Sequence, residues 1–128
     1  MNLLLDTHAF LWMSLDDPQL SETARGELSD TENELYLSPA SYWEIAIKIS
    51  IGKYNLTEPL AAFVKREIIA NNFKVLPIDI DHTAEISALP FHHKDPFDRM
   101  LIAQSMVENF PLVSRDTILD QYGVVRIW

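Results

Sequence analysis

Four carboxylates in this 128-residue chain lie where a folded α/β domain could bring them together: Asp6, Glu44, Asp98 and Asp116. Asp6 and Asp116 each follow a short apolar run near opposite ends of the sequence, and the other two lie in helical patterns between them. Several like charges in close contact are costly unless a cation lies among them, and all-oxygen ligands suit Mg²⁺ or Mn²⁺. Such a cluster predicts metal-assisted hydrolysis of a phosphodiester bond.

Each carboxylate also has a more ordinary interpretation. Asp6 and Asp116 could be helix N-caps, a position at which Asp is common. Glu44 shares a narrow polar stripe with Ser41 and Lys48 on an otherwise apolar helix. That stripe could be a solvated face with a Glu44–Lys48 ion pair, or it could line an acidic cleft with Lys48 near an incoming phosphate. Local sequence alone does not separate these alternatives.

The stretch Asp95-Pro96-Phe97-Asp98 predicts a helix start. Asp95 can accept a backbone N–H as N-cap, Pro96 suits the first helical position, and Asp98 falls near the positive end of the helix dipole. The ordinary role of Asp98 is this favourable charge placement, and the functional role is metal ligation. Asp95 is then a helix cap or an auxiliary ligand.

Cations flank these acids and are candidates for contact with the phosphates of a polyanion: Lys48, Arg99 and Arg115. Surface ion pairs, which contribute little to stability, are the alternative use of these side chains. The adjacent His92 and His93 are expected to be solvated loop residues. A histidine zinc site is disfavoured because the chain has no cysteine and only four histidines.

Composition excludes several other classes of function. Ten Lys and Arg against 19 Asp and Glu give a net charge of -9, so any nucleic acid must be held locally rather than by a diffuse positive field. The lack of cysteine excludes a disulfide framework, and the three glycines do not form a phosphate-binding loop. No targeting segment or apolar run of ~20 residues is visible, so we expect a cytoplasmic protein without membrane contact.

The elements that must position these side chains follow from hydrophobic patterning and turn residues. Short apolar runs predict five strands, at residues 3–5, 35–38, 74–78, 111–114 and 124–127. Helical spacing and capping residues predict helices around 9–12, from the cap Ser21 to about 28, and over 39–51, 60–71, a short stretch after 81, 95–108 and 116–121. Core packing is expected for four aromatic residues: Trp12, Tyr42, Trp43 and Phe97.

The alternation of strands and helices predicts a single domain over residues 1–128. The expected fold is an α/β/α sandwich with a mostly parallel central sheet of about five strands. Ligands bind at the carboxyl ends of such strands, near the point where the strand order reverses. Asp6 and Asp116 would therefore lie on the same edge of the sheet although they come from opposite ends of the chain.

Four segments together resemble PIN-domain proteins of the VapC toxin type. They are Leu3-Leu4-Leu5-Asp6-Thr7-His8, Ser38-Pro39-Ala40-Ser41-Tyr42-Trp43-Glu44-Ile45-Ala46, Asp95-Pro96-Phe97-Asp98-Arg99-Met100-Leu101-Ile102-Ala103-Gln104 and Leu112-Val113-Ser114-Arg115-Asp116. The segments occur in the order and at the intervals of that family and span essentially the whole chain. The resemblance implies a PIN-like fold and places the four acidic positions of the family at Asp6, Glu44, Asp98 and Asp116.

The resemblance also implies an activity and partners. It implies a Mg²⁺- or Mn²⁺-dependent endoribonuclease that acts on RNA as the toxin of a type II toxin–antitoxin pair. Thr7 and Ser114 are similar to the hydroxyl residues that hold the acidic pocket of the family by hydrogen bonds, and Asp95 stays a cap or auxiliary ligand. Family members commonly form homodimers, and the C-terminal segment of a cognate antitoxin covers the acidic cleft.

Two other functions remain open at this point. One is a noncatalytic protein-interaction module of the same fold, in which the acids form a vestigial metal pocket. The other is an acidic phosphoryl-acceptor domain. It is weaker, because Asp6 stands alone after the first strand and Lys94 does not follow the last one.

Overall fold

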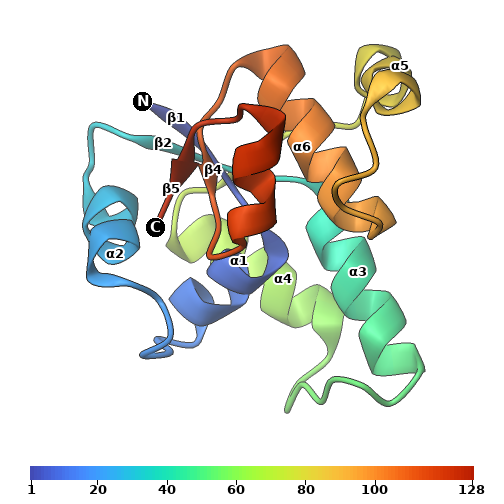
Figure 1. Cartoon of the computed structure of the whole chain (residues 1–128). Coiled ribbons are helices and arrows are strands. Elements are labelled where there is room, and N and C mark those ends of the chain that lie inside the picture. The colour runs from blue at the N-terminus through green and yellow to red at the C-terminus, as the bar shows by residue number, and fades with distance from the viewer.

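The apolar run Leu3-Leu4-Leu5 forms the central strand of a parallel sheet in the computed structural model, which describes residues 1–128 (Figure 1). All three leucines are fully buried. Leu3 and Leu5 pack into one core cluster and Leu4 into another, as the two-residue repeat of a strand requires. A strand that is covered on both faces needs such a continuous apolar run.

Every strand and helix predicted from the sequence is present. The strands are β1 Asn2–Leu5, β2 Glu34–Leu37, β3 Lys74–Val75, β4 Leu112–Val113 and β5 Arg126–Ile127. The helices are α1 Thr7–Ser14, α2 Glu22–Ser29, α3 Pro39–Ser50, α4 Leu60–Ala70, α5 Ile80–Ala88 and α6 Pro96–Glu108, and a 3₁₀ helix, η1, spans Thr117–Tyr122. None of the helices has the length and hydrophobicity that crossing a bilayer requires.

Strands β3, β4 and β5 are shorter than predicted, with two residues each against the predicted 74–78, 111–114 and 124–127, and one helix differs in type. Strand β3 is shorter than the predicted 74–78, because it lies at the edge of the sheet and Pro77 has no N–H to continue the ladder. The short helix predicted over 116–121 is a 3₁₀ helix whose C-cap is Gly123, at a φ of 73° in the left-handed region.

The strand order is β3-β2-β1-β4-β5, and all four pairings are parallel. The order reverses between β1 and β4, which are neighbours in the sheet although their residues are distant in sequence. Leu5 is paired with Val113, so Asp6 and Ser114 are the next residues at the same edge. The Asp6 N–H donates to the Val113 carbonyl at 3.1 Å and extends this pairing beyond the strands.

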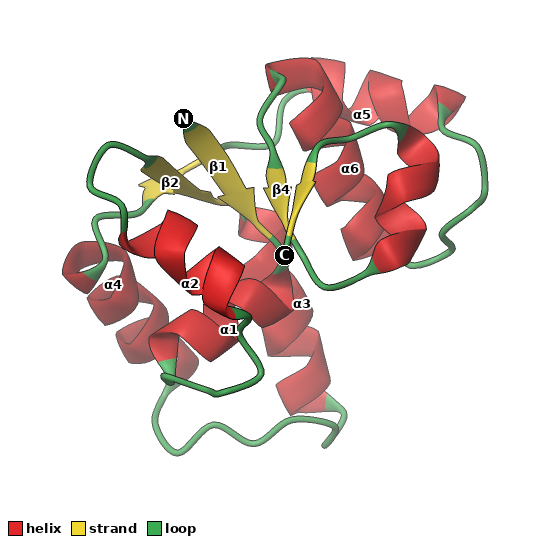
Figure 2. Ribbon diagram, turned by 60° about the vertical axis from the view of Figure 1, so that its left-hand side comes forward, coloured by secondary structure: helices red, strands yellow, loops and turns green.

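Helices cover both faces of the sheet (Figure 2). One core cluster joins the sheet to α1, α2 and α4, with Phe10 and Phe63 packed edge to face at 5.9 Å. The other joins the opposite face to α6 and η1 through residues such as Ile102 and Leu119. Helix α3 contacts both clusters, through Ala40 at its start and Ile45 in its middle. The predicted α/β/α sandwich is confirmed, and its sheet is parallel throughout.

Helix α3 presents its polar stripe to the protein and part of its apolar surface to solvent. Ser41 and Glu44 are buried, whereas Trp43 is 58% exposed and lies edge-on against Phe97 at 5.1 Å. The prediction that Trp43 packs in the core is therefore wrong, because its side of the helix faces away from the sheet. Trp12, by contrast, is a core residue as predicted.

Candidate metal centre

The candidate aspartates are helix caps and cavity residues at the same time. Oδ1 of Asp6 accepts from the Ala9 N–H at 2.8 Å and begins α1, and Oδ1 of Asp116 accepts from the Ile118 N–H at 3.0 Å and begins η1. A carboxylate has two oxygens, so one can cap a helix while the other faces a ligand. The ordinary and the functional interpretations of these residues are therefore compatible.

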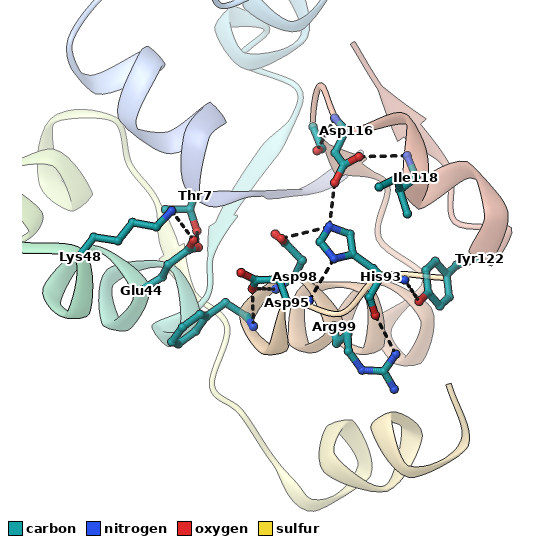
Figure 3. A network of polar contacts seen from close by, with 12 residues as sticks. Thr7, Glu44, Lys48, His93, Asp95, Asp98, Arg99, Asp116, Ile118 and Tyr122 are labelled. Carbon is teal, nitrogen blue, oxygen red and sulfur yellow. Dashed lines mark hydrogen bonds and ion pairs between the residues drawn. The ribbon is translucent and has the colours of Figure 1, made fainter. Parts of the chain in front are cut away.

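Asp98 and Asp116 both approach Nε2 of the His93 imidazole (Figure 3). His93 Nε2 lies 2.8 Å from Asp116 Oδ2 and 3.2 Å from Asp98 Oδ2. The three ligand-type atoms of these residues all lie within 4.8 Å of one another. His93 Nδ1 accepts from the Asp95 N–H at 3.2 Å, so the neutral ring carries its proton on Nε2, which donates to Asp116 Oδ2 and lies close to Asp98 Oδ2.

Neither the position nor the importance of His93 was predicted. The expectation that it is a solvated loop residue is wrong, since its side chain is only 13% exposed and bridges two carboxylates. Its backbone N–H donates to the Tyr122 hydroxyl at 2.8 Å, and that hydroxyl donates to the Pro90 carbonyl at 2.8 Å. The local signal is its place two residues before the N-cap Asp95, which is too weak to identify a site.

Glu44 forms a separate group beside this cluster (Figure 3). The Thr7 hydroxyl donates to Glu44 Oε1 at 2.6 Å, and Lys48 Nζ lies 2.8 Å from Glu44 Oε2. Both alternatives for the polar stripe of α3 hold in part. The ion pair with Lys48 exists, but Glu44 is buried rather than solvated, and its charge contributes to raising the pKa of Asp98 and of Asp6.

The pKa values of two aspartates show how closely the acids converge. Burial and the negative charge of Asp95, with smaller contributions from Glu44 and Asp6, raise the pKa of Asp98 to about 7, against the charge of His93, which lowers it. Burial also raises the pKa of Asp6, against a hydrogen bond from Ser114 that lowers it. A divalent cation would relieve both the desolvation and the repulsion.

The cluster opens into a cavity of about 470 Å³, which we call the carboxylate cavity. Its walls include Asp6, Asp98 and Asp116, together with His93 and Arg115. The donors are oxygens with one imidazole beside them and no thiolate, a set that fits Mg²⁺ or Mn²⁺. Glu44 does not line this cavity, and its two oxygens are held by Thr7 and Lys48.

The two predicted hydroxyl residues contact the acids. Thr7 holds Glu44, as described above, while Ser114 donates to Asp6 and accepts the Asp116 N–H at 3.1 Å. Asp95 has a different role: its Oδ1 accepts from the N–H groups of Phe97 and Asp98 at 2.8 and 3.1 Å. The prediction that Asp95 caps this helix is confirmed.

The prediction that Arg99 binds the phosphates of a polyanion is wrong. Its guanidinium is buried and donates to four backbone carbonyls, including those of Leu89 at 3.2 Å, Pro90 at 2.9 Å and His93 at 3.2 Å. It cannot also bind a phosphate in solvent. Arg99 instead fixes the loop that carries His93, because the uncapped carbonyls of that loop need donors.

Arg115 and Lys48 remain near the acids. The Arg115 guanidinium lies 4.7 Å from the centre of the Trp12 ring, on the wall of the carboxylate cavity. Lys48 is held by Glu44, and the nearby charges of Glu44, Asp95 and Asp98 raise the pKa of its ammonium. Both cations therefore lie next to the acidic cluster.

Known proteins share this sequence pattern and this fold. Ribonuclease VapC16 of Mycobacterium tuberculosis is 37% identical over 71 residues, which are 52% of this chain and 50% of that protein. The chain thus matches about half the length of this curated relative.

Solved structures with the same fold include VapBC2 from Rickettsia felis bound to a promoter DNA fragment. It has a TM-score of 0.72 at 14% identity, covering 98% of this chain and 97% of that one. VapBC-1 from nontypeable Haemophilus influenzae has a TM-score of 0.65 at 14% identity, with coverage of 98% and 96%. Residues 3–125 match the sequence profile of the PIN domain, and because that match covers nearly the whole chain, the protein belongs to the PIN domain family.

Proposed function

We propose that this chain is a Mg²⁺- or Mn²⁺-dependent endoribonuclease and the toxin of a type II toxin–antitoxin pair. The observation that carries the proposal is the convergence of Asp6, Asp98 and Asp116 on one cavity, with a pKa of about 7 for Asp98. The relative named as a ribonuclease, VapC16, supports the same activity over half of its length. The acidic residues proposed for the site are Asp6, Glu44, Asp98 and Asp116, with Asp95 as cap or auxiliary ligand.

A bound divalent ion would supply a water of lowered pKa and positive charge near the phosphate. Asp98 would hold that ion as a carboxylate, so its proton must leave before or during binding. His93 would keep Asp98 and Asp116 at a fixed separation through its Nε2–H. Arg115, on the cavity wall, would contact a non-bridging phosphate oxygen.

An antitoxin is the protein partner that we propose. The carboxylate cavity would accept a cationic side chain from an antitoxin segment, since its acids carry excess negative charge. The Rickettsia felis and Haemophilus influenzae neighbours are VapBC proteins, which agrees with this partner. A cytoplasmic location fits the same proposal.

A homodimer is the proposed oligomer. Trp43 and Ile47 of α3 and its C-cap Ile51 recur every four residues and are 58%, 37% and 58% exposed. An apolar stripe of this kind is typical of a surface covered by another chain. Light scattering of the purified protein should give twice the chain mass, and Ile51→Glu should give a monomer. A monomeric unmodified chain would rule out this dimer.

Cleavage of a total cellular RNA pool by the purified protein tests the activity. Discrete products should appear with Mg²⁺ or Mn²⁺, should vanish with EDTA, and should be absent for Asp98→Asn. Glu108→Gln is a matched control, because Glu108 is a carboxylate of α6 outside the carboxylate cavity. A protein free of antitoxin that cuts no RNA under any of these conditions would favour the noncatalytic interaction module.

A further inference from the structure

A second cavity, of about 480 Å³, adjoins the carboxylate cavity and shares two of its walls, His8 and Trp12. Its lining also includes Lys48, Lys53 and Tyr54, and we call it the lysine cavity. Its volume is in the ~300–1,000 Å³ range of small-molecule sites. An RNA strand whose phosphate lies at the acids would reach the lysine cavity next, because His8 and Trp12 line both cavities.

Several of the basic side chains of this protein line these two cavities. The chain has ten Lys and Arg side chains. Four of them form ion pairs away from the two cavities: Arg25, Arg66, Lys74 and Arg126. A fifth, Arg99, is buried and donates to backbone carbonyls. Three of the remaining five line the two cavities: Lys48, Lys53 and Arg115. Lys48 is paired with Glu44, so the unpaired cations of this region are Lys53 and Arg115, which lie beside the acidic cluster of a chain with a net charge of -9.

The aromatic side chains suit a nucleobase. His8 is exposed, and its ring lies 5.2 Å from Trp12 at an interplanar angle of 30°. Tyr54 is partly buried and lines the lysine cavity together with the exposed Lys53. Cations that track a backbone together with aromatic surfaces for bases are the combination that binds single-stranded nucleic acid. One acid, Asp17, also lines the cavity, and its Oδ1 accepts from the Gln19 N–H at 2.8 Å.

We propose that the lysine cavity binds the nucleotide adjacent to the scissile phosphate of a single-stranded RNA, with Lys53 on its phosphate and its base against His8 or Tyr54. The inference rests on the proposed ribonuclease function and adds a subsite to it. The lysine cavity suits RNA better than a peptide as its ligand. Binding of a peptide would need many directed contacts to its backbone, whereas binding of an RNA strand needs cations and aromatic rings, which line this cavity.

Binding of RNA to the full-length Asp98→Asn variant tests the subsite without cleavage. The probe is a pool of fluorescein-labelled 12-nucleotide RNAs of randomised sequence, measured by anisotropy over a series of salt concentrations. Lys53→Gln in this background should lower the slope of log affinity against log salt by about 0.7, the value for one phosphate contact with a single strand. Lys65→Gln is the matched control, because Lys65 is also exposed and unpaired but lines neither cavity. It should leave the slope unchanged.

Crosslinking gives an independent readout. The same pool carrying 4-thiouridine should crosslink, on irradiation, to the peptide that contains Tyr54 or to the peptide that contains His8 and Trp12. Equal salt slopes for Lys53→Gln and Lys65→Gln, with crosslinks to other peptides, would overturn the proposed subsite. The nuclease proposal would still hold in that case if the unmodified chain cleaves RNA in a metal-dependent way. Loss of both RNA binding and cleavage would overturn the nuclease and the subsite together.

Discussion

Two histidines of this protein have nearly the same hydrogen bonds but lie in different surroundings. His82 Nδ1 accepts the Asp79 N–H at 3.1 Å, and its Nε2 lies 2.9 Å from Glu108. His93 Nδ1 accepts the Asp95 N–H at 3.2 Å, and its Nε2 lies between Asp98 and Asp116. In both histidines, a backbone N–H donates to Nδ1 and so fixes the tautomer, in which the proton on Nε2 can be donated to a carboxylate.

The number of carboxylates and the presence of a cavity separate the two clusters. The His82 ring is fully buried, completes the capping box of α5, and ties that helix to Glu108 of α6. The His93 cluster has additional acids around it and opens into the carboxylate cavity. A satisfied histidine–carboxylate pair stabilises the fold, whereas a surplus of carboxylates in an open cavity calls for a cation.

Neutralising one acid in each cluster tests most directly whether the two clusters have different roles. Asp98→Asn should reduce metal-dependent RNA cleavage by more than about a hundredfold, because it removes a proposed ligand of the ion. Glu108→Gln should leave the rate of cleavage within a few-fold of the unmodified chain. Initial rates at equal concentrations of folded protein measure both. Similar losses for the two variants would contradict the division into a structural and a functional cluster.

The His82 cluster should dominate stability. His82→Ala removes a fully buried ring and the second half of the α5 capping box, and should lower the free energy of unfolding by about 2–4 kcal/mol. Urea unfolding followed by circular dichroism measures the loss. Cleavage per folded molecule should not change, and a fall in that rate would show that this cluster also serves the reaction.

His93 is expected to be a positioning residue for the proposed metal ligands. His93→Ala should weaken Mn²⁺ binding by about 10- to 100-fold, the usual effect of losing a hydrogen-bond donor to a metal ligand. His93→Gln, whose amide N–H can reach the place of Nε2–H, should recover part of the affinity. Isothermal titration calorimetry with Mn²⁺ alone measures these constants. Unchanged Mn²⁺ affinity for both variants would limit His93 to a structural role.

The smallest expected effect is on the pH dependence of stability in EDTA. The folded pKa of Asp98 is about 7 against an ordinary value of 3.8, so between these values the folded chain binds more protons than the unfolded chain. The contribution of Asp98 to stability is therefore lost as the pH rises through this window. The melting temperature of the unmodified chain should fall more steeply between about pH 4 and pH 7 than that of Asp98→Asn. Parallel profiles would mean that Asp98 does not titrate in this range.

Much of the fold was predictable because the signals are local. The apolar run of β1, the cap Ser21, and the Asp95-Pro96 start of α6 each define an element within a few neighbouring residues. The errors fall where tertiary packing decides. Trp43 was expected in the core, and nothing in the pattern of α3 states which of its two faces meets the sheet.

The sequence by itself determined the order of the elements, the parallel α/β class, and the acids at the carboxyl ends of β1 and β4. These depend on periodicity, capping and chain order, which are properties of short segments. Only the tertiary structure decided that His93 bridges Asp98 and Asp116, that Arg99 is buried, and that Glu44 is held by Thr7. Those contacts join residues far apart in the chain, such as His93 and Asp116 at a separation of 23 and Thr7 and Glu44 at 37, and no local pattern encodes such a pairing.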